Sequence, residues 1–247
     1  MLHELLLQTQ QPSGFGGIGI GYWLIMGATA LVSMAISGAL KSRFREYSKI
    51  PMRMTGAEVA ESMLRQNGIN DVRVVSVPGQ LTDHYDPSKK TVNLSEPVYH
   101  MNSVAAAAVA AHECGHALQH QQAYAWLTFR SKMVPAVQIA SQLQSVLFMM
   151  LIFGAFAFGS GATIFIWVFL GVLAVTTLFS LVTLPVEFDA SRRALVWLEQ
   201  SGLAQQMHHD KAKNALFWAA MTYVAAAVGA VAQLAYWAMI LLGGRRE

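Results

Sequence analysis

The stretch "MVPAVQIASQLQSVLFMMLIFGAFAFGSGATIFIWVFLGVLAVTTLFSLVTLPV", residues 133–186, contains no aspartate, glutamate, lysine or arginine. A helix crosses the hydrocarbon core of a bilayer with about 20 apolar residues, so this run is too long for one span and suits two. We expect the two spans at about Val137–Phe158 and Ala162–Leu184, with a turn at Gly159–Gly161. An uncharged hairpin of this length predicts an integral membrane protein.

Two further apolar stretches lie outside this hairpin, at about Ile18–Leu40 and Leu216–Leu242. Over the whole chain 54% of residues are hydrophobic and only 13% are charged, against a charged share of about 25% in soluble proteins. The first stretch is not typical of a signal peptide, because no basic residue precedes it and no small-residue cleavage site follows. We therefore expect a mainly α membrane protein with about four transmembrane helices, rather than a soluble protein with a buried helical core.

The basic residues indicate how the chain is oriented in the membrane. Residues 1–17 contain no lysine or arginine, whereas the first span is followed closely by Lys41, Arg43, Arg45, Lys49 and Arg53. The positive-inside rule then predicts a multi-pass protein of the cell membrane with its N-terminus outside. The expected segments are residues 1–40 with the first span, a cytoplasmic insert at 41–135, the hairpin at 136–185, a second cytoplasmic segment at 186–214, and the last span at 215–247.

The net charge of +3 and the placement of the basic residues give no sign of a nucleic-acid partner. The single cysteine, Cys114, excludes an internal disulfide.

The insert at 41–135 is the one sizeable segment outside the expected spans, and its patterns predict a small α+β unit. Turn residues, β-branched runs and capping residues set its elements. In chain order we expect a helix opened by a capping box at Thr55–Glu58, a strand at Val72–Val77, a turn at Asp86–Lys89, an extended segment at Thr91–Ser95, and an alanine-rich helix capped by Asn102 or Ser103.

The alanine-rich helix carries "HECGH", which matches the pattern His-Glu-x-x-His. On a helix, residues four apart share one face, so His112 and His116 can bind one zinc ion per chain. Glu113 borders the same site and can act as the general base that takes a proton from water. The motif therefore predicts a zinc-dependent hydrolase.

A hydrolytic zinc site needs a third protein ligand and one open position. The candidates lie in "LPVEFDASRRAL", Leu184–Leu195, which follows the hairpin and so returns to the side of the histidines. We favour Glu187 as the ligand, with Asp189 as an alternative ligand or as an acceptor for the free N–H of a zinc-bound histidine. Both acids could instead pair with Arg192 and Arg193 at the membrane surface.

Other polar side chains near the motif receive weaker roles. His120 lies about 12 Å along the helix from His112 and is expected at the surface rather than on the metal. Cys114 points to another face and is expected to pack in the interior. The candidates for stabilising an oxyanion, each weighed against a simple role in a turn or at the surface, are His84, Tyr85, His208 and His209.

Several blocks together resemble the YugP-like neutral zinc metallopeptidases of bacterial membranes. These blocks are "LTDHYDP" (81–87), "VNLSEPVY" (92–99), "AAHECGHALQH" (110–120), "PVEFDASRRAL" (185–195) and "AAMTYVAAA" (219–227). The chain is more distantly similar to the HtpX and CAAX-prenyl-protease membrane gluzincins, in which His-Glu-x-x-His is followed by Glu-x-x-x-Asp. This similarity implies a zincin-like insert with Glu187 as ligand, although Ser191 stands where that pattern has aspartate.

We therefore expect a membrane-embedded zinc metalloendopeptidase that cleaves a protein or peptide substrate at the cytoplasmic side. Lys90–Ser95 is expected to align the substrate backbone by strand addition. One alternative is an intramembrane site-two-type protease, which would need an Asp-Gly pair that this sequence lacks. Another is a non-catalytic scaffold or transporter with a structural metal, for which Glu113 would have no use. The lipid bilayer is an expected partner, and the sequence does not fix the oligomeric state.

Overall fold

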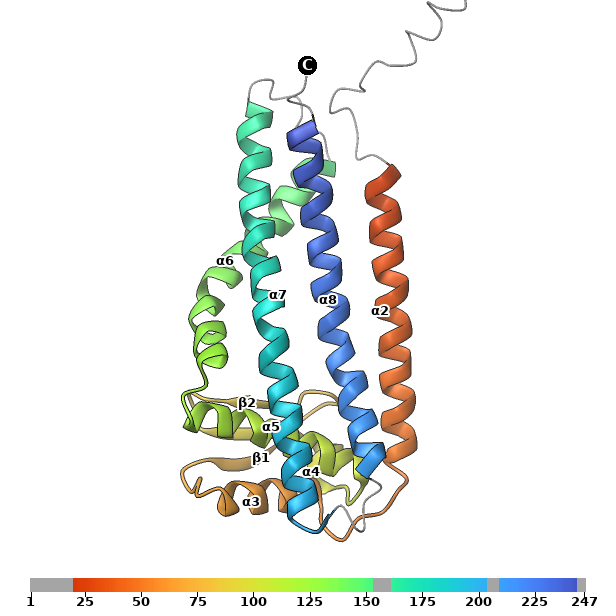
Figure 1. Ribbon diagram of the computed structural model, residues 1–247, viewed down its shortest axis with the longest axis vertical. Helices are drawn as coiled ribbons and strands as arrows, with labels where there is room; N and C mark the ends of the chain where they lie inside the picture. The colour runs from red at the N-terminus through yellow and green to blue at the C-terminus, as the bar shows by residue number, and fades with distance from the viewer. Residues whose placement is uncertain (1–19, 153–160, 204–208, 244–247) are drawn as a thin grey trace, which may run out of the picture.

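The computed structural model describes residues 20–152, 161–203 and 209–243. Four of its helices are long and apolar enough to cross a membrane. In Figure 1, α2, α7 and α8 run roughly parallel with α2 on one flank, whereas α6 begins on the other flank and crosses behind α7 and α8. Their bounds are α2 Ile20–Tyr47, α6 Ala125–Ile152, α7 Gly161–Gln200 and α8 His209–Gly243.

All four predicted spans fall on these helices where the chain is described, but each helix extends further toward the soluble end than the apolar pattern indicated, and α2 ends at Tyr47 instead of Leu40. Helix α6 begins at Ala125, α7 continues through Pro185 to Gln200, and α8 begins at His209. The added turns carry polar residues because they pack against the soluble part instead of lipid. The expected turn at Gly159–Gly161 lies largely outside the described residues, as does the end of the predicted span at Phe158.

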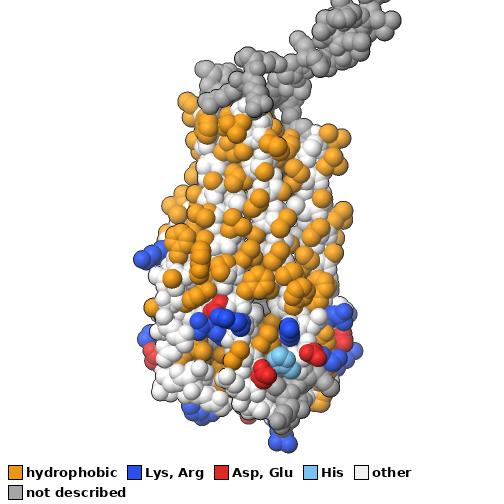
Figure 2. Space-filling model, in the orientation of Figure 1, with side chains coloured by type: hydrophobic (Ala, Val, Ile, Leu, Met, Phe, Trp, Pro, Cys, Tyr) orange, Lys and Arg blue, Asp and Glu red, His pale blue; other side chains and the backbone are white. Residues whose placement is uncertain are grey.

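The surface of the molecule divides into two zones (Figure 2). Apolar side chains cover the long bundle, whereas the charged side chains gather around the end that holds the small sheet. Exposed apolar residues occur on every span, as expected where lipid is the solvent, and examples are Leu31 on α2, Ile139 on α6, Trp167 on α7 and Met239 on α8.

The soluble part begins with helix α3, Gly56–Gln66, and its capping box is confirmed. The Thr55 hydroxyl accepts a hydrogen bond from the backbone N–H of Glu58, and the Glu58 carboxylate accepts one from the backbone N–H of Thr55. These bonds satisfy donors that an open helix end leaves unpaired. The buried face of α3, which includes Val59 and Met63, packs on α5 in the core of the soluble part.

The sheet has three strands in the order β1-β3-β2. Strand β1 (Arg73–Val77) pairs parallel with the central strand β3 (Thr91–Ser95), and β2 (His84–Asp86) pairs antiparallel with β3. The sequence predicted β1 and β3 but not β2, which is too short to show an alternating pattern. Both edges of β3 are therefore occupied, and the expectation that Lys90–Ser95 aligns substrate by strand addition is wrong. Both β2 and β3 contact helix α5.

After β3 the short helix α4, Glu96–His100, leads into α5, Val104–Gln121. The Ser103 hydroxyl accepts a hydrogen bond from the backbone N–H of Ala106, so Ser103 is the cap of the predicted pair Asn102 and Ser103. Helix α5 lies across the ends of the long helices in Figure 1, between the sheet and α7. Its alanines are fully buried, since small side chains allow neighbours to approach it on several sides.

Candidate metal centre

Helix α5 presents His112 and His116 on the face that meets α7. The two rings lie edge to face with their centroids 4.9 Å apart. Glu187 enters from α7, with Oε2 at 3.3 Å from His112 Nε2 and at 3.6 Å from His116 Nε2. One potential ligand atom from each residue lies within 4.8 Å of the others. The structure thus brings together the three side chains that the sequence predicted as metal ligands.

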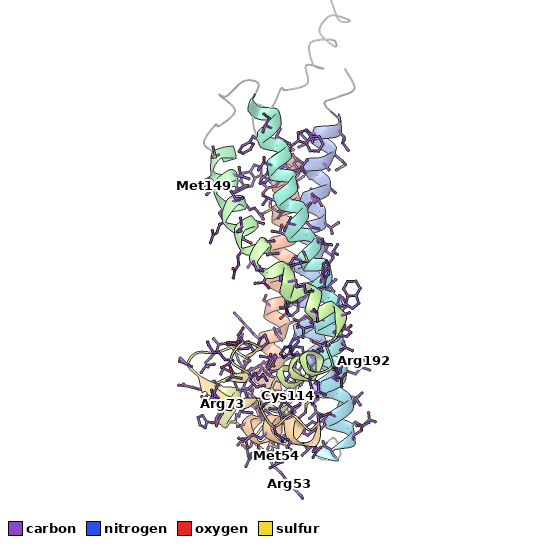
Figure 3. The ribbon with its side chains drawn as sticks, turned by 90° about the vertical axis from the view of Figure 1, so that its left-hand side faces the viewer. Arg53, Met54, Arg73, Cys114, Met149 and Arg192 are labelled. Carbon is purple, nitrogen blue, oxygen red and sulfur yellow. The ribbon has the colours of Figure 1, made fainter. Side chains whose placement is uncertain are left out.

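A glycine permits the close approach of the two helices that carry these side chains. A Cβ atom placed on Gly115 would lie 2.6 Å from the carbonyl oxygen of Ala190 on α7, far inside van der Waals contact. The glycine between the two histidines therefore lets α5 and α7 pack backbone to backbone. In Figure 3, α5 with the labelled Cys114 lies directly beside the part of α7 that carries Arg192.

The Nδ1 atom of each histidine ring lies within hydrogen-bonding distance of one neutral side chain. Ser191 Oγ lies 3.1 Å from His112 Nδ1, and Gln119 Oε1 lies 3.0 Å from His116 Nδ1. An acceptor at Nδ1 fixes the tautomer that leaves Nε2 free to bind a metal. Sequence reasoning did not assign either role, although Ser191 shares a helix face with Glu187 four residues earlier.

Asp189 pairs with Arg192 and Arg193, which is the alternative that the sequence left open for it. It accepts hydrogen bonds from Gln119 Nε2 at 2.9 Å and from the guanidinium groups of Arg192 and Arg193. Among the described contacts Asp189 reaches His116 only through Gln119, so the predicted direct bond to a histidine is wrong. The physical reason is the helix period, because a residue two positions after Glu187 points about 200° away from it.

Glu113 is buried beside the two histidines and faces the same cavity. Burial raises the pKa of its carboxyl, and the neighbouring imidazoles act in the opposite direction without cancelling the effect. Burial also acts to lower the pKa of His116, but the carboxylates of Glu187 and Glu113 outweigh it and raise that pKa. Both pKa values thus reflect a buried environment in which an isolated charge is costly.

A cavity of about 630 Å³ opens over these residues. Its wall includes β2 on one side and the start of α6 on the other, so both the soluble part and the membrane bundle contribute to it. Arg130 of α6 lies in this wall and places NH1 3.5 Å from Glu187 Oε1, the oxygen that faces away from the histidines. Tyr223 of α8 also lines the cavity. Neither residue was singled out from the sequence.

The remaining predicted residues have structural partners or lie apart. The His120 ring bonds through Nδ1 to the Tyr85 hydroxyl at 2.9 Å, outside the ligand cluster, as expected for a residue that does not bind the metal. His84 Nδ1 lies 2.8 Å from the carbonyl oxygen of Thr82. Both His84 and Tyr85 line the cavity, whereas His209 is not among its lining residues. His208 lies outside the described residues.

Cys114 is fully buried on another face of α5, with Sγ 3.6 Å from the carbonyl oxygen of Ala60. It is the packing residue that the sequence predicted.

The sequence was compared with protein families and with individual proteins. The family described as "Putative neutral zinc metallopeptidase" matches residues 22–242 of the chain. The chain belongs to this family. It is 44% identical over 210 residues to "Putative membrane protease YugP" of Bacillus subtilis (strain 168), a match that covers 84% of this chain and 91% of the relative. No solved structure matches the chain.

Membership of the zinc metallopeptidase family indicates zinc as the metal, and the geometry of the cluster fits it. Four ligands in a tetrahedron at about 2.0–2.1 Å from zinc lie about 3.3–3.4 Å from one another. The separations of 3.3 Å and 3.6 Å between Glu187 Oε2 and the two Nε2 atoms are close to that value. Two imidazoles and a carboxylate are also a ligand set that hydrolytic zinc sites use.

Proposed function

We propose that this chain is a membrane-embedded zinc endopeptidase whose metal is held by His112, His116 and Glu187. The observation that carries the proposal is the convergence of these three side chains with Glu113 at the wall of one 630 Å³ cavity. A closed structural site would be expected to have four protein ligands and no adjoining cavity. A cavity beside three ligands and a buried acid instead favours catalysis.

Zinc in such a site supplies a Lewis acid that polarises a carbonyl group and makes water acidic enough to lose a proton near neutral pH. Glu113 takes that proton and returns it to the leaving amine, which requires a base that is ionised before attack and buried enough to be a strong acceptor. Ser191 and Gln119 keep the histidine rings turned so that their Nε2 atoms converge. Arg130 forms an ion pair with Oε1 of Glu187, so Oε2 remains available to bind the metal.

Strand β2, rather than β3, is the proposed guide for the substrate backbone. It is an edge strand of the sheet, and His84 and Tyr85 from this strand line the cavity. An extended peptide that adds to this edge would run past the ligands with its carbonyl groups held in register. Tyr223, on the other side of the cavity, offers a hydroxyl that can donate to the oxygen that becomes negative during attack.

The alternatives fit less well. An intramembrane protease of the site-two type would carry its histidine motif within a span, whereas α5 crosses the end of the bundle and packs against the soluble sheet. A scaffold with a structural metal would not need a buried Glu113 at a cavity. The basic residues at the soluble end of α2 and just after it support a cytoplasmic location for the site.

The test separates metal binding from chemistry in the purified full-length protein. We expect His112→Ala or His116→Ala to abolish zinc binding, measured by elemental analysis. We expect Glu113→Gln to retain zinc but to lose roughly 10²- to 10⁴-fold in cleavage of casein, because only the base is removed. His100→Ala, at an exposed histidine that ends α4, is the matched control and should change neither quantity. Loss of zinc from the Glu113→Gln protein would contradict the assignment of Glu113 as base.

A further inference from the structure

A second recess lies within the membrane bundle, and we call it the bundle groove. It has a volume of about 400 Å³ and receives residues from all four spans. Its polar lining residues are Thr29 and Ser33 of α2, Ser141 and Gln144 of α6, Thr176 and Thr177 of α7, and Gln233 of α8. Its wall on α8 is otherwise built of the small residues Ala225, Ala226, Gly229 and Ala230. Polar lining is costly in a lipid environment and marks a candidate functional surface.

The groove exists because α2 and α6 meet at the far end of the bundle and then diverge. At that end Tyr22 of α2 contacts Phe148 of α6 and Trp237 of α8, with ring centroids 6.1 Å and 5.6 Å apart. Helix α6 contains Pro135 and changes direction along its length in Figure 1, as an interior proline causes. The groove therefore narrows away from the metal centre and widens toward it.

Two glutamines in the groove each have a polar atom without a partner. Gln144 Oε1 accepts a long hydrogen bond of 3.5 Å from Thr176, and Gln233 Nε2 donates to the sulfur of Met26. Among the described residues, nothing accepts from the Gln144 amide nitrogen or donates to Gln233 Oε1. At this depth an unsatisfied amide costs free energy. Within a membrane, water or a second polypeptide can supply such a partner.

The bundle groove and the cavity over the metal ligands are lined by the same three helices, α6, α7 and α8. On α8, Tyr223 lines the cavity and Ala226, three residues on, lines the groove. On α7, Glu187 belongs to the cavity and Thr177 to the groove. Ten residues of helix rise about 15 Å, so the groove lies about 15 Å from the metal ligands along α7. An extended peptide covers that distance with about five residues.

From these observations we propose that the bundle groove binds a transmembrane helix of the substrate, and that the substrates are membrane proteins cut about five residues beyond the end of a span. The proposal rests on the peptidase function proposed above. The helix seats one face against α8 and α7, and the chain that follows it unwinds into the cavity toward strand β2.

A helix suits this groove better than a lipid chain does. The small residues on α8 allow a second helix to approach closely, and serine, threonine or asparagine side chains on it can satisfy Gln144 and Gln233. An acyl chain offers no hydrogen bond to either amide. A volume of 400 Å³ admits the side chains along one face of a helix, while the rest of that helix stays in lipid.

The first test is cross-linking in lipid vesicles, and it does not depend on turnover. A photoactivatable residue is placed at Ser141 in the full-length Glu113→Gln protein, with the same residue at Gln142 as the matched control. Ser141 lines the groove, whereas Gln142 is exposed on α6 and does not line it. The probe is a single-span peptide of about 20 leucines and alanines with a central serine, followed by a soluble linker. We expect adducts from position 141 and few from position 142.

Equal adducts at the two positions would overturn the proposal, as would adducts with lipid alone. A second probe carries the same linker on a myristoyl chain, and its preferential capture at position 141 would assign the groove to acyl chains instead.

The second test compares cleavage by Gln144→Leu and Gln142→Leu. Loss of one hydrogen bond in the membrane should reduce cleavage of the helix-anchored linker about three- to twentyfold in Gln144→Leu. Cleavage of the same linker as a free peptide should be unchanged, as should both reactions of Gln142→Leu. Equal cleavage of the anchored linker by the two variants would refute the proposal that the bundle groove binds the substrate helix. If the wild type cleaves neither substrate, the peptidase function fails, and the cross-linking result still decides whether the groove binds a helix.

Discussion

At the scale of single residues, the metal centre has neutral acceptors where a carboxylate would hold a ligand more strongly. Ser191 and Gln119 bond to the Nδ1 atoms of the two histidines. A hydroxyl or amide oxygen attracts the ring N–H less than an ionised carboxylate does, since charge-assisted bonds are stronger. The charge of Asp189 still reaches His116, but only by polarising the Gln119 amide. If the proposed ligands bind zinc, its affinity therefore depends on uncharged side chains.

The first prediction at this scale follows from those contacts. Ser191→Ala and Gln119→Leu should each lower zinc affinity about 10- to 100-fold, because the rings lose the acceptor that orients them. Asp189→Asn should have a smaller effect, since it acts through Gln119. Affinity is measured by competition with a chelator on the purified protein. Ser201→Ala, near the end of α7, is the control, because its hydroxyl bonds only within its own turn. If Asp189→Asn lost more zinc affinity than Gln119→Leu, the idea that Asp189 acts through Gln119 would be refuted.

The sequence indicates the charged and titratable part of the site but not its neutral part. His112, Glu113 and His116 follow from helix periodicity, and Glu187 follows from the return of the chain after two spans. Gln119 and Ser191 carry no comparable signal, because glutamine and serine are common on helices without any role. Their function depends on the crossing of α5 and α7, which brings together side chains that lie far apart in the sequence.

At the scale of elements, that crossing depends on Gly115. The Ala190 carbonyl oxygen lies where a Cβ on Gly115 would clash at 2.6 Å. Backbone atoms cannot move aside as a flexible side chain does. Gly115→Ala should therefore push α7 away from α5 and separate Glu187 from the histidines.

We predict that Gly115→Ala lowers the free energy of unfolding by about 1–3 kcal/mol, the usual range for an overpacked contact, and that it weakens zinc binding. The measurements are thermal unfolding and zinc content of the purified protein. Gly171→Ala on α7 is the matched control, since a Cβ there meets nothing within 4 Å. Wild-type zinc content and stability in Gly115→Ala would show that the two helices are not held in this close contact.

Among the elements, the long apolar helices were predictable and the sheet order was not. The spans follow from uncharged runs, but their ends at Ala125, Gln200 and His209 depend on packing against the soluble part. Strand β2 has only three residues, so its position at the sheet edge follows from long-range pairing with β3. The sequence therefore did not indicate that β3, the strand expected to align the substrate, is the central strand of the sheet.

At the scale of the whole molecule, the two cavities lie in series along α7 and α8. The bundle groove and the cavity that holds the metal ligands are both lined by α7 and α8, and strand β2 borders that cavity at the soluble end. A substrate that enters from the membrane would meet the helix-binding surface first and the catalytic residues second. This order makes the side of the membrane on which the soluble part lies a functional property, because it sets which end of a substrate span is cut.

The last prediction concerns that side. The basic residues in the last turns of α2 and just after it predict that the soluble part lies in the cytoplasm, because positive charge is retained there. Ser88 is exposed in the soluble part and Ile20 is exposed at the opposite end of α2. In a Cys114→Ala background, Ser88→Cys should react with a membrane-impermeant maleimide only after the cells are permeabilised, whereas Ile20→Cys should react on intact cells. The native Cys114 contributes little in any case, because burial raises the pKa of its thiol. Labelling of Ser88→Cys on intact cells, with Ile20→Cys protected, would place the catalytic cavity outside.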